Sequence, residues 1–248
     1  MELLVSLILV FFIGIFTSFI GVIGGGGGLI SIPFLIFIGL PPQIAVATNK
    51  CGSVGLITAA IPKFWKAEKI IWKYVLPFTG VSIVAAYFGA NLLLSLDPGV
   101  LEPILGVMLL FILPFFLFEK ELGTIRVKTN KLKKIIGFIL YCLVLTYGSF
   151  IGAGSGVLIF YTLMFFFGFT ILEANATNSI PWFVMSVTSL GIYAWYGIIN
   201  WTYGLALFVG MYIGGYLGAH TAIKKGDTWV KTFFAFVVVC SALKLLLF

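Results

Sequence analysis

Long apolar runs separated by short polar stretches dominate this sequence. Crossing the hydrocarbon core of a membrane takes about 20 apolar residues in a helix. Runs near that length cover residues 3–22, 43–62, 74–95, 100–118, 135–152, 174–196, 203–222 and 229–247. Two further runs are shorter; residues 29–40, for example, would form a helix of about 18 Å, and the other covers residues 157–167. The pattern predicts an all-α polytopic membrane protein in which two helices are too short to cross alone.

The two halves of the chain repeat one plan. Ser18-Phe19-Ile20-Gly21 parallels Ser149-Phe150-Ile151-Gly152, and Ala47-Thr48-Asn49 parallels Ala176-Thr177-Asn178, with offsets of 131 and 129 residues. A third parallel pairs residues 86–91 with residues 215–220 at the offset of 129. We therefore predict two repeats of five segments, each with one short broken helix after a glycine-rich stretch. The expected division is a first repeat at 1–118, a basic linker at 119–134 and a second repeat at 135–248.

Charge is scarce and unevenly placed. The chain has 248 residues, 61% of them hydrophobic and 9% charged, against about 25% charged residues in soluble domains. All lysines and arginines except Lys50 and Lys244 fall in residues 63–73, 120–134 and 224–231. Short basic loops mark the cytoplasmic side of a membrane, so the net charge of +7 does not indicate nucleic-acid binding.

The basic loops occupy opposite positions in the two repeats. The third segment of the first repeat is followed by the basic residues 63–73, whereas its equivalent in the second repeat is followed by the neutral residues 197–202. The difference is reversed after the fourth segment: the first repeat has Asp97 and no basic residue there, whereas the second repeat has Lys224-Lys225. We therefore expect inverted repeats in the cell (plasma) membrane, with five crossings per copy and both termini extracytoplasmic.

Glycines interrupt each repeat before its short helix. Glycine disfavours helix by about 1 kcal/mol relative to alanine, and non-helical backbone at membrane depth occurs only against protein or a watery cavity. N–H groups at a helix N-terminus favour anions, so we interpret both breaks as parts of one substrate site. The candidate residues are Gly25, Gly26, Gly27 and Gly28 in the first break and Gly154, Ser155 and Gly156 in the second. The alternative is close helix packing through small residues.

Polar residues follow each short helix. Thr48-Asn49 and Thr177-Asn178 are hydrogen-bond donors for a ligand, or N-caps of the helices that follow. Lys50 has Ser179 as its counterpart, and a lysine within a membrane segment usually faces a cavity, where an anion would offset its charge. The alternative is that Lys50 extends to a membrane interface.

Other polar residues carry weaker hypotheses. Glu102 and Glu173 are candidate proton carriers or surface residues, and Asn91 could line the interface between the copies. We interpret His220 as uninvolved, and the cysteines as small core residues without metal-ligand spacing. No nucleophile–base pair, metal cluster or phosphate-binding loop is recognisable, so we expect neither an enzyme nor a cofactor.

The motifs resemble those of the TauE/SafE family of sulfite and organosulfonate exporters. The resemblance rests on Gly21 with the glycines 24–28, on residues 45–49, and on the second copy at residues 152–156 and 174–178. It covers nearly the whole chain and implies transport of small sulfur-containing or organic anions such as sulfite or sulfoacetate. Ser155 stands where the family pattern has a glycine.

We therefore expect a secondary transporter that moves a small anion by alternating access. The sequence leaves open an anion channel and a membrane component that relays sulfur through Cys51. It also leaves open coupling to protons or other ions, and assembly into a homo-oligomer.

Overall fold

The structure, a computed structural model, describes residues 2–97 and 123–247. This part of the chain is helical throughout and contains no strand. The helices are α1 (Glu2–Gly24), α2 (Gly28–Phe37), α3 (Pro42–Lys66), α4 (Trp72–Ser95), α6 (Lys131–Phe150), α7 (Ser155–Phe167), α8 (Ile171–Trp195) and α9 (Trp201–Leu247). The predicted segment at 100–118 lies outside the described residues.

Among the described residues, five helices are long and apolar enough to cross a membrane, and α7 with α8 forms a further, bent pair. The axes of α7 and α8 differ by 117°. The predicted segments 203–222 and 229–247 belong to α9, which is interrupted at Gly226 with φ 79° and ψ 175°. The all-α polytopic fold class is therefore confirmed.

One predicted boundary is wrong. The apolar run at residues 43–62 predicts a third segment that ends at Pro62, yet α3 continues to Lys66 with Pro62 inside it. Proline removes one backbone hydrogen bond from a helix, and membrane helices tolerate this where neighbouring helices satisfy the freed group. Pro33, Pro77 and Pro181 also lie inside helices.

Both short helices begin at the glycine breaks. The helix α1 ends at Gly24, and Gly25 follows with φ 69°. In the second half, Gly152 and Gly154 have φ values of 83° and 72° between α6 and α7. Glycine adopts positive φ without the steric cost that a side chain imposes, so both chain reversals depend on it.

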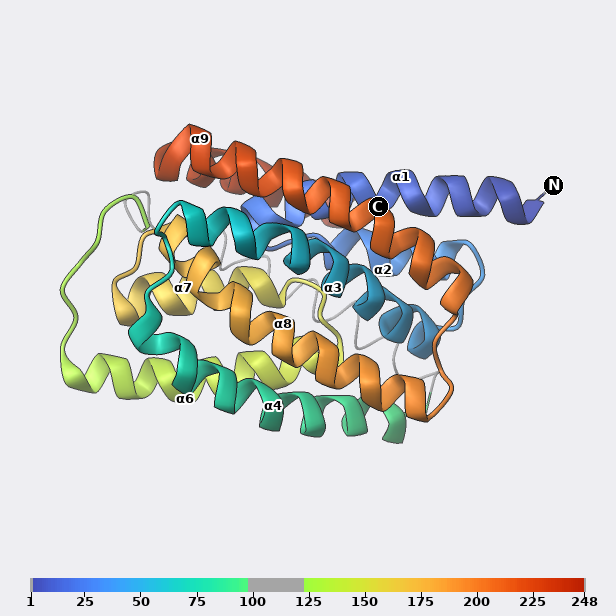
Figure 1. Cartoon of the computed structure of the whole chain (residues 1–248), viewed down its shortest axis with the longest axis horizontal. Helices are drawn as coiled ribbons and strands as arrows, with labels where there is room; N and C mark the ends of the chain where they lie inside the picture. Colours follow the sequence, from blue (N-terminus) through green and yellow to red (C-terminus); the bar gives the residue numbers. More distant parts are fainter. Residues whose placement is uncertain (1, 98–122, 248) are drawn as a thin grey trace.

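Helices at equivalent positions of the two halves run in opposite directions. Figure 1 shows α1 and α6 running opposite ways along the long axis, and α3 and α8 doing the same. The contacts between the halves come in matching pairs: α1 packs on α9 as α6 packs on α4, and α3 packs on α9 as α8 packs on α4.

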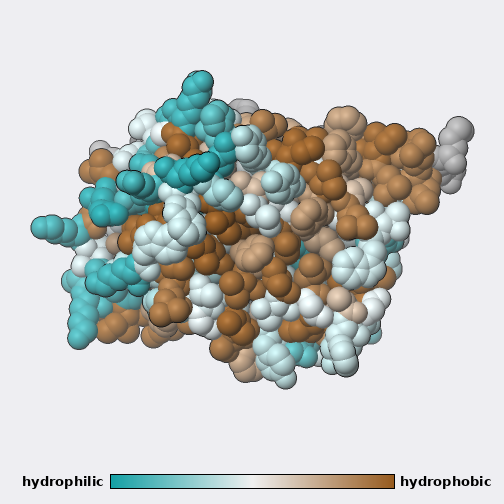
Figure 2. All heavy atoms as spheres, in the orientation of Figure 1, coloured by the Kyte–Doolittle hydropathy of each residue, from teal (hydrophilic) through white to brown (hydrophobic). Residues whose placement is uncertain are grey.

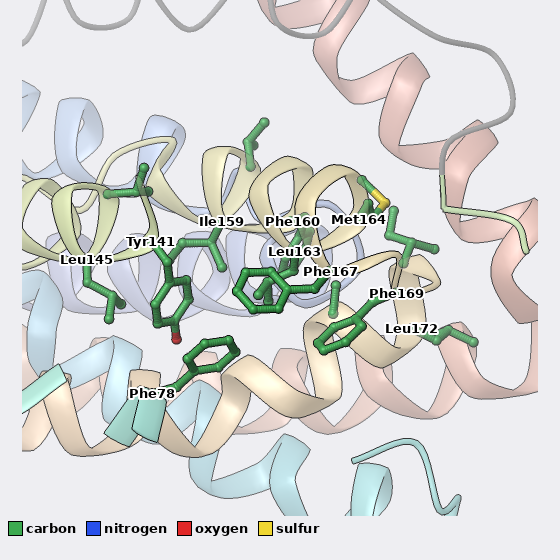
Figure 3. Close-up of a cluster of buried hydrophobic side chains, with 14 of the residues drawn as sticks. Phe78, Tyr141, Leu145, Ile159, Phe160, Leu163, Met164, Phe167, Phe169 and Leu172 are labelled. Carbon is green, nitrogen blue, oxygen red and sulfur yellow. The ribbon is translucent and has the colours of Figure 1, made fainter. Parts of the chain in front are cut away.

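An aromatic core fills the space between α4, α6, α7 and the start of α8 (Figure 3). The rings of Phe78 and Tyr141 lie 4.2 Å apart between centroids, and Phe167 meets Phe78 edge-on at 5.4 Å. The Tyr141 hydroxyl donates to Asn178 Oδ1 at 2.7 Å. This core therefore fixes a polar residue of α8 as well as the helices.

Hydrophilic side chains gather at one end of the molecule, remote from the N-terminus (Figure 2). Side chains of the basic segments meet other elements at this end. Lys63 Nζ lies 3.9 Å from the centroid of the Tyr216 ring, and Arg126 pairs with Glu173 at 2.5 Å. We call this the basic end.

Candidate functional site

A cavity of about 90 Å³ lies where the two glycine breaks meet. A single buried water needs about 10–15 Å³ of such space, so the cavity has room for several waters or a small ligand. Equivalent residues of both repeats line it. These include the pairs Gly25 and Gly156, Asn49 and Asn178, and Lys50 and Ser179.

The two breaks touch through Gly25 and Gly156. A Cβ built on Gly25 would lie 2.6 Å from Gly156 C, and one built on Gly156 would lie 2.6 Å from Gly25 O. Real side chains do not come this close to backbone atoms, so both positions require glycine. This contact brings the starts of α2 and α7 together beside the cavity.

Lys50 brings a charged group to the cavity. Its side chain is 2% exposed, and Nζ donates to Gly148 O at 2.7 Å and lies 6.0 Å from the centroid of the Trp182 ring. Among the described residues, Gly148 O is the only hydrogen-bond acceptor of Lys50 Nζ. Two of the three N–H donors of the ammonium group are therefore left for a ligand. Lys50 thus lies in the interior and does not extend to a membrane interface.

The lining is otherwise neutral. Among the described residues that line the cavity, Lys50 is the only one whose side chain carries a formal charge. An isolated charge in a low-dielectric interior is unfavourable unless a partner compensates it. The cavity is therefore suited to a bound anion.

Two equivalent asparagines present their amides to the cavity. Asn49 Oδ1 accepts a hydrogen bond from Ser31 Oγ at 2.7 Å, as Asn178 Oδ1 does from Tyr141. Neither Nδ2 group has a protein acceptor among the described residues. With the oxygens occupied, these amides can offer N–H donors to a ligand.

The threonines beside them bind the opposite half instead. Thr48 Oγ1 accepts from the backbone N–H of Asn200, and Thr177 Oγ1 accepts from that of Ile71, at 3.1 and 3.0 Å. Thr48 and Thr177 do not line the cavity. The alternative of N-capping their own helices is wrong, because both lie well inside helices that begin at Pro42 and Ile171.

The remaining candidates divide between the cavity and its supports. Gly27 and Gly28 line the cavity, whereas Gly26 and Gly154 do not. Ser155 is fully buried, and its hydroxyl donates to Gly152 O at 2.7 Å. Ser155 thus stabilises the second break without facing the cavity.

Sequence reasoning missed several lining residues on α3 and α8, namely Ser53, Asn175, Ser179 and Trp182. Asn175 is the clearest of these, because it precedes Asn178 by three residues and helical spacing places both on one face. Its Nδ2 donates to Val22 O, at the end of α1.

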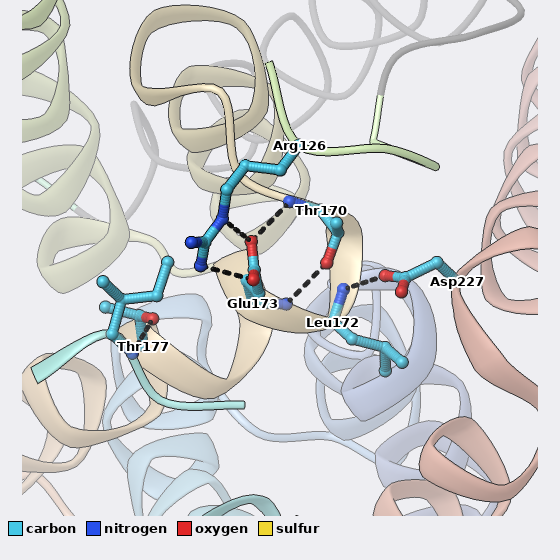
Figure 4. A network of polar contacts seen from close by, with 7 residues as sticks. Arg126, Thr170, Leu172, Glu173, Thr177 and Asp227 are labelled. Atoms are coloured by element: carbon cyan, nitrogen blue, oxygen red, sulfur yellow. Dashed lines mark hydrogen bonds and ion pairs between the residues drawn. The ribbon is translucent and has the colours of Figure 1, made fainter. Parts of the chain in front are cut away.

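Glu173 has a structural role at the basic end (Figure 4). The Thr170 hydroxyl accepts from Glu173 N, the Glu173 carboxylate accepts from Thr170 N, and Arg126 binds the same carboxylate. Asp227 accepts from Leu172 N in the same turn. These contacts cap α8 and tie the linker and α9 to it.

The other polar candidates lie away from the cavity. Asn91 is half-buried and donates to Tyr87 O in its own helix, and His220 is exposed. Cys51 is buried against Gly204 and does not line the cavity. Glu102 lies outside the described residues.

Comparison with known proteins gives one family match. Residues 10–245 match the family model described as "Sulfite exporter TauE/SafE". The chain is 29% identical to a "Probable membrane transporter protein" of Haemophilus influenzae, covering 91% of this chain and 88% of that protein.

Two further relatives carry similar names. "Probable membrane transporter protein ORF9" of a Sinorhizobium species is 28% identical, covering 93% of this chain and 88% of its own. "Probable membrane transporter protein YfcA" of Escherichia coli K12 is 27% identical, with 95% and 88% covered. No solved structure matches the chain.

Proposed function

Because this chain belongs to the sulfite exporter TauE/SafE family of membrane transporters, we propose that it is a secondary transporter that moves a small anion by alternating access. The proposed substrates are sulfite, sulfoacetate or a related sulfur-containing or organic anion. The observation that carries the proposal is the buried Lys50 ammonium in an otherwise uncharged cavity.

The cavity's donors favour an oxyanion. Lys50 Nζ, the amides of Asn49 and Asn178, and the backbone at Gly27 and Gly28 all border the same space. Hydrogen bonds from charged donors to anions are short and strong, and several neutral donors would share the remaining oxygens. The proposed substrate site consists of the candidate residues that line the cavity, namely Gly25, Gly27, Gly28, Asn49, Lys50, Gly156 and Asn178. The other candidates support it from outside the lining: Gly26, Thr48, Gly154, Ser155 and Thr177.

We further propose that the halves are inverted copies with the basic end in the cytoplasm. Support comes from the opposite directions of α1 and α6 (Figure 1) and from reciprocal contacts. Thr48 binds the backbone of residue 200 and Thr177 that of residue 71, and both partners differ by the repeat offset of 129. Exchange of equivalent contacts is the mark of a two-fold relation, and inverted repeats with broken helices are typical of secondary transporters.

Flux measurements in proteoliposomes test this function. Radiolabelled sulfite or sulfoacetate should enter with saturating kinetics, and Lys50→Ala should reduce uptake at least about ten-fold, since an interaction with a charged group is worth about 1.5–3 kcal/mol. Lys224→Ala, which removes a lysine at the exposed basic end, is the matched control and should transport normally. Undiminished uptake by Lys50→Ala would remove this residue from the site.

The same preparations separate the alternatives. An anion channel would give macroscopic, non-saturating currents in planar bilayers. A sulfur relay through Cys51 would lose activity in Cys51→Ser, whereas a transporter should retain it because Cys51 lies outside the cavity lining.

A further inference from the structure

The cavity extends to one side only. At its centre both α3 and α8 contribute, through Lys50 and its equivalent Ser179 and through Ser53 and its equivalent Trp182. Beyond the centre the cavity follows α3 toward the basic end, past Ile57, Ala60 and Phe64. The equivalent residues of α8 lie between the cavity and the end of the molecule opposite the basic end, and none of them lines the cavity. They are Ser186, Ser189 and Tyr193.

This other side is closed by a buried hydrogen-bond cluster. Tyr193 OH donates to Ser149 O at 3.1 Å, and Ser149 Oγ donates to Ala86 O at 3.0 Å. The hydroxyls of Ser149 and Ser189 lie 2.9 Å apart. All four residues are fully buried, so the cluster joins α4, α6 and α8 into a seal.

Ser186 lies on α8 between the cavity residue Trp182 and this seal. Its hydroxyl is buried and has no hydrogen-bond partner within the described part of the chain. Buried polar groups in native structures are almost always paired. An unpaired hydroxyl at this place indicates that a ligand, water or another conformation supplies its partner.

The equivalent positions at the basic end cannot form such a cluster. Tyr193 corresponds to Phe64, Ser189 to Ala60 and Ala86 to Gly215. Ser18, which corresponds to Ser149, donates to Ile15 O in its own helix. The two sides of the cavity therefore differ in chemistry as well as in closure.

We propose that the face of α8 formed by Ser186, Ser189 and Tyr193 is the second half of the anion's path, and that the Tyr193–Ser149–Ser189 cluster is its gate. This inference rests on the proposed transport function. Opening the gate breaks the hydrogen bond from Tyr193 OH to Ser149 O and separates α8 from α6, which frees the Tyr193 hydroxyl to donate to an oxyanion. The closed state then has the cavity extending toward the basic end, and the open state exposes α8 to the opposite side.

Cysteine accessibility tests the gate without any substrate. In a chain whose own cysteines are replaced by serine, Ser186→Cys reports on the gated side and Ala60→Cys on the basic side. A membrane-impermeant thiol reagent is applied to each side of sealed vesicles in turn, and the rate of labelling is measured. Tyr193→Phe and Ser189→Ala weaken the gate by installing the residues that the first repeat has at these positions.

Both gate variants should raise labelling at residue 186 from the side opposite the basic end by about 2- to 10-fold, the effect of one lost hydrogen bond. Labelling at residue 60 from the basic side should not rise. Tyr87→Phe and Ser95→Ala, which change exposed residues of α4, are the matched controls and should leave both rates unchanged.

Unchanged labelling at residue 186 in both gate variants would overturn the proposal. A rise at both reporters would also overturn it, because that result indicates general loosening of the fold. Gated labelling without flux of the tested anions would uphold the gate and count against the substrate. Saturable flux with residue 186 inaccessible throughout would uphold transport and remove this gate.

Discussion

Replacing Gly25 by alanine should be far more damaging than replacing its neighbour Gly26. Gly25 has φ 69°, and an added Cβ would lie 2.6 Å from Gly156 C and 2.7 Å from Val157 N. Gly26 has no positive φ, and the nearest atom to its added Cβ is Leu29 Cδ1 at 3.5 Å. The two substitutions thus share chemistry and location and differ in contact and backbone geometry.

The magnitude follows from two terms. A left-handed conformation costs a non-glycine residue about 1–2 kcal/mol, and inserting a methyl group into a packed contact costs about 1–3 kcal/mol. Gly25→Ala should therefore destabilise the protein by about 2–5 kcal/mol. Each kcal/mol corresponds to about 2–4 °C for a chain of this size, so the melting midpoint should fall by roughly 10 °C.

Thermal unfolding of the purified protein in detergent measures this difference, with the wild-type chain and Gly26→Ala side by side. Gly156→Ala should resemble Gly25→Ala, because its added Cβ would lie 2.6 Å from Gly25 O. The double variant should lose less than the sum, because either substitution alone already forces apart the one backbone contact that the two glycines share. Equal melting midpoints for Gly25→Ala and Gly26→Ala would refute the close contact between the two glycine breaks at Gly25 and Gly156.

Three further predictions concern the Thr170 cap of α8, the Asn178 amide in the cavity and the charge of the cavity. Thr170→Ala removes the side-chain cap on Glu173 N and should destabilise α8 by about 0.5–2 kcal/mol, measured as a lower melting midpoint with normal substrate affinity. Asn178→Asp should raise the apparent KM for an anion at least about ten-fold by adding a negative charge to the cavity, whereas Asn91→Asp, at a half-buried position of α4 outside the cavity lining, should leave KM unchanged. Because Lys50 is the single formal charge among the described lining residues, a monoanion such as methanesulfonate should inhibit uptake more strongly than the dianion sulfate in a competition assay, since a second charge would stay uncompensated. Among the proposed substrates the same reasoning favours the monoanion hydrogensulfite over sulfoacetate, which is a dianion at neutral pH; equal inhibition by the monoanion and the dianion would contradict it.

Periodicity and repetition in the sequence were sufficient to predict the helices, and they singled out polar residues that line the cavity. The apolar runs match α1, α3, α4, α6, α7, α8 and both parts of α9, because run length is what a membrane constrains. Lys50, Asn49 and Asn178 were proposed from the sequence as ligand contacts, and all three line the cavity.

Side-chain partners could not be predicted in this way. Thr48 and Thr177 belong to the most recognisable motif of the chain, yet each binds the backbone of the other half. A repeat in sequence shows that two residues are equivalent but not which element lies opposite them. Ser155 was placed in the site for its hydroxyl, and that hydroxyl satisfies Gly152 O of its own break.

The glycine runs show why site formation and close packing were not competing explanations. Added Cβ atoms on Gly25 and Gly156 would meet each other's backbone, and one on Gly28 would lie 3.3 Å from Ala153 Cα. These glycines are therefore required for close approach of the two halves. That approach lets Lys50 of α3 reach Gly148 O of α6 at 2.7 Å, from which its remaining donors face the cavity. Packing at the breaks thus creates the geometry in which a buried ammonium and two amides from separate repeats meet around one small space.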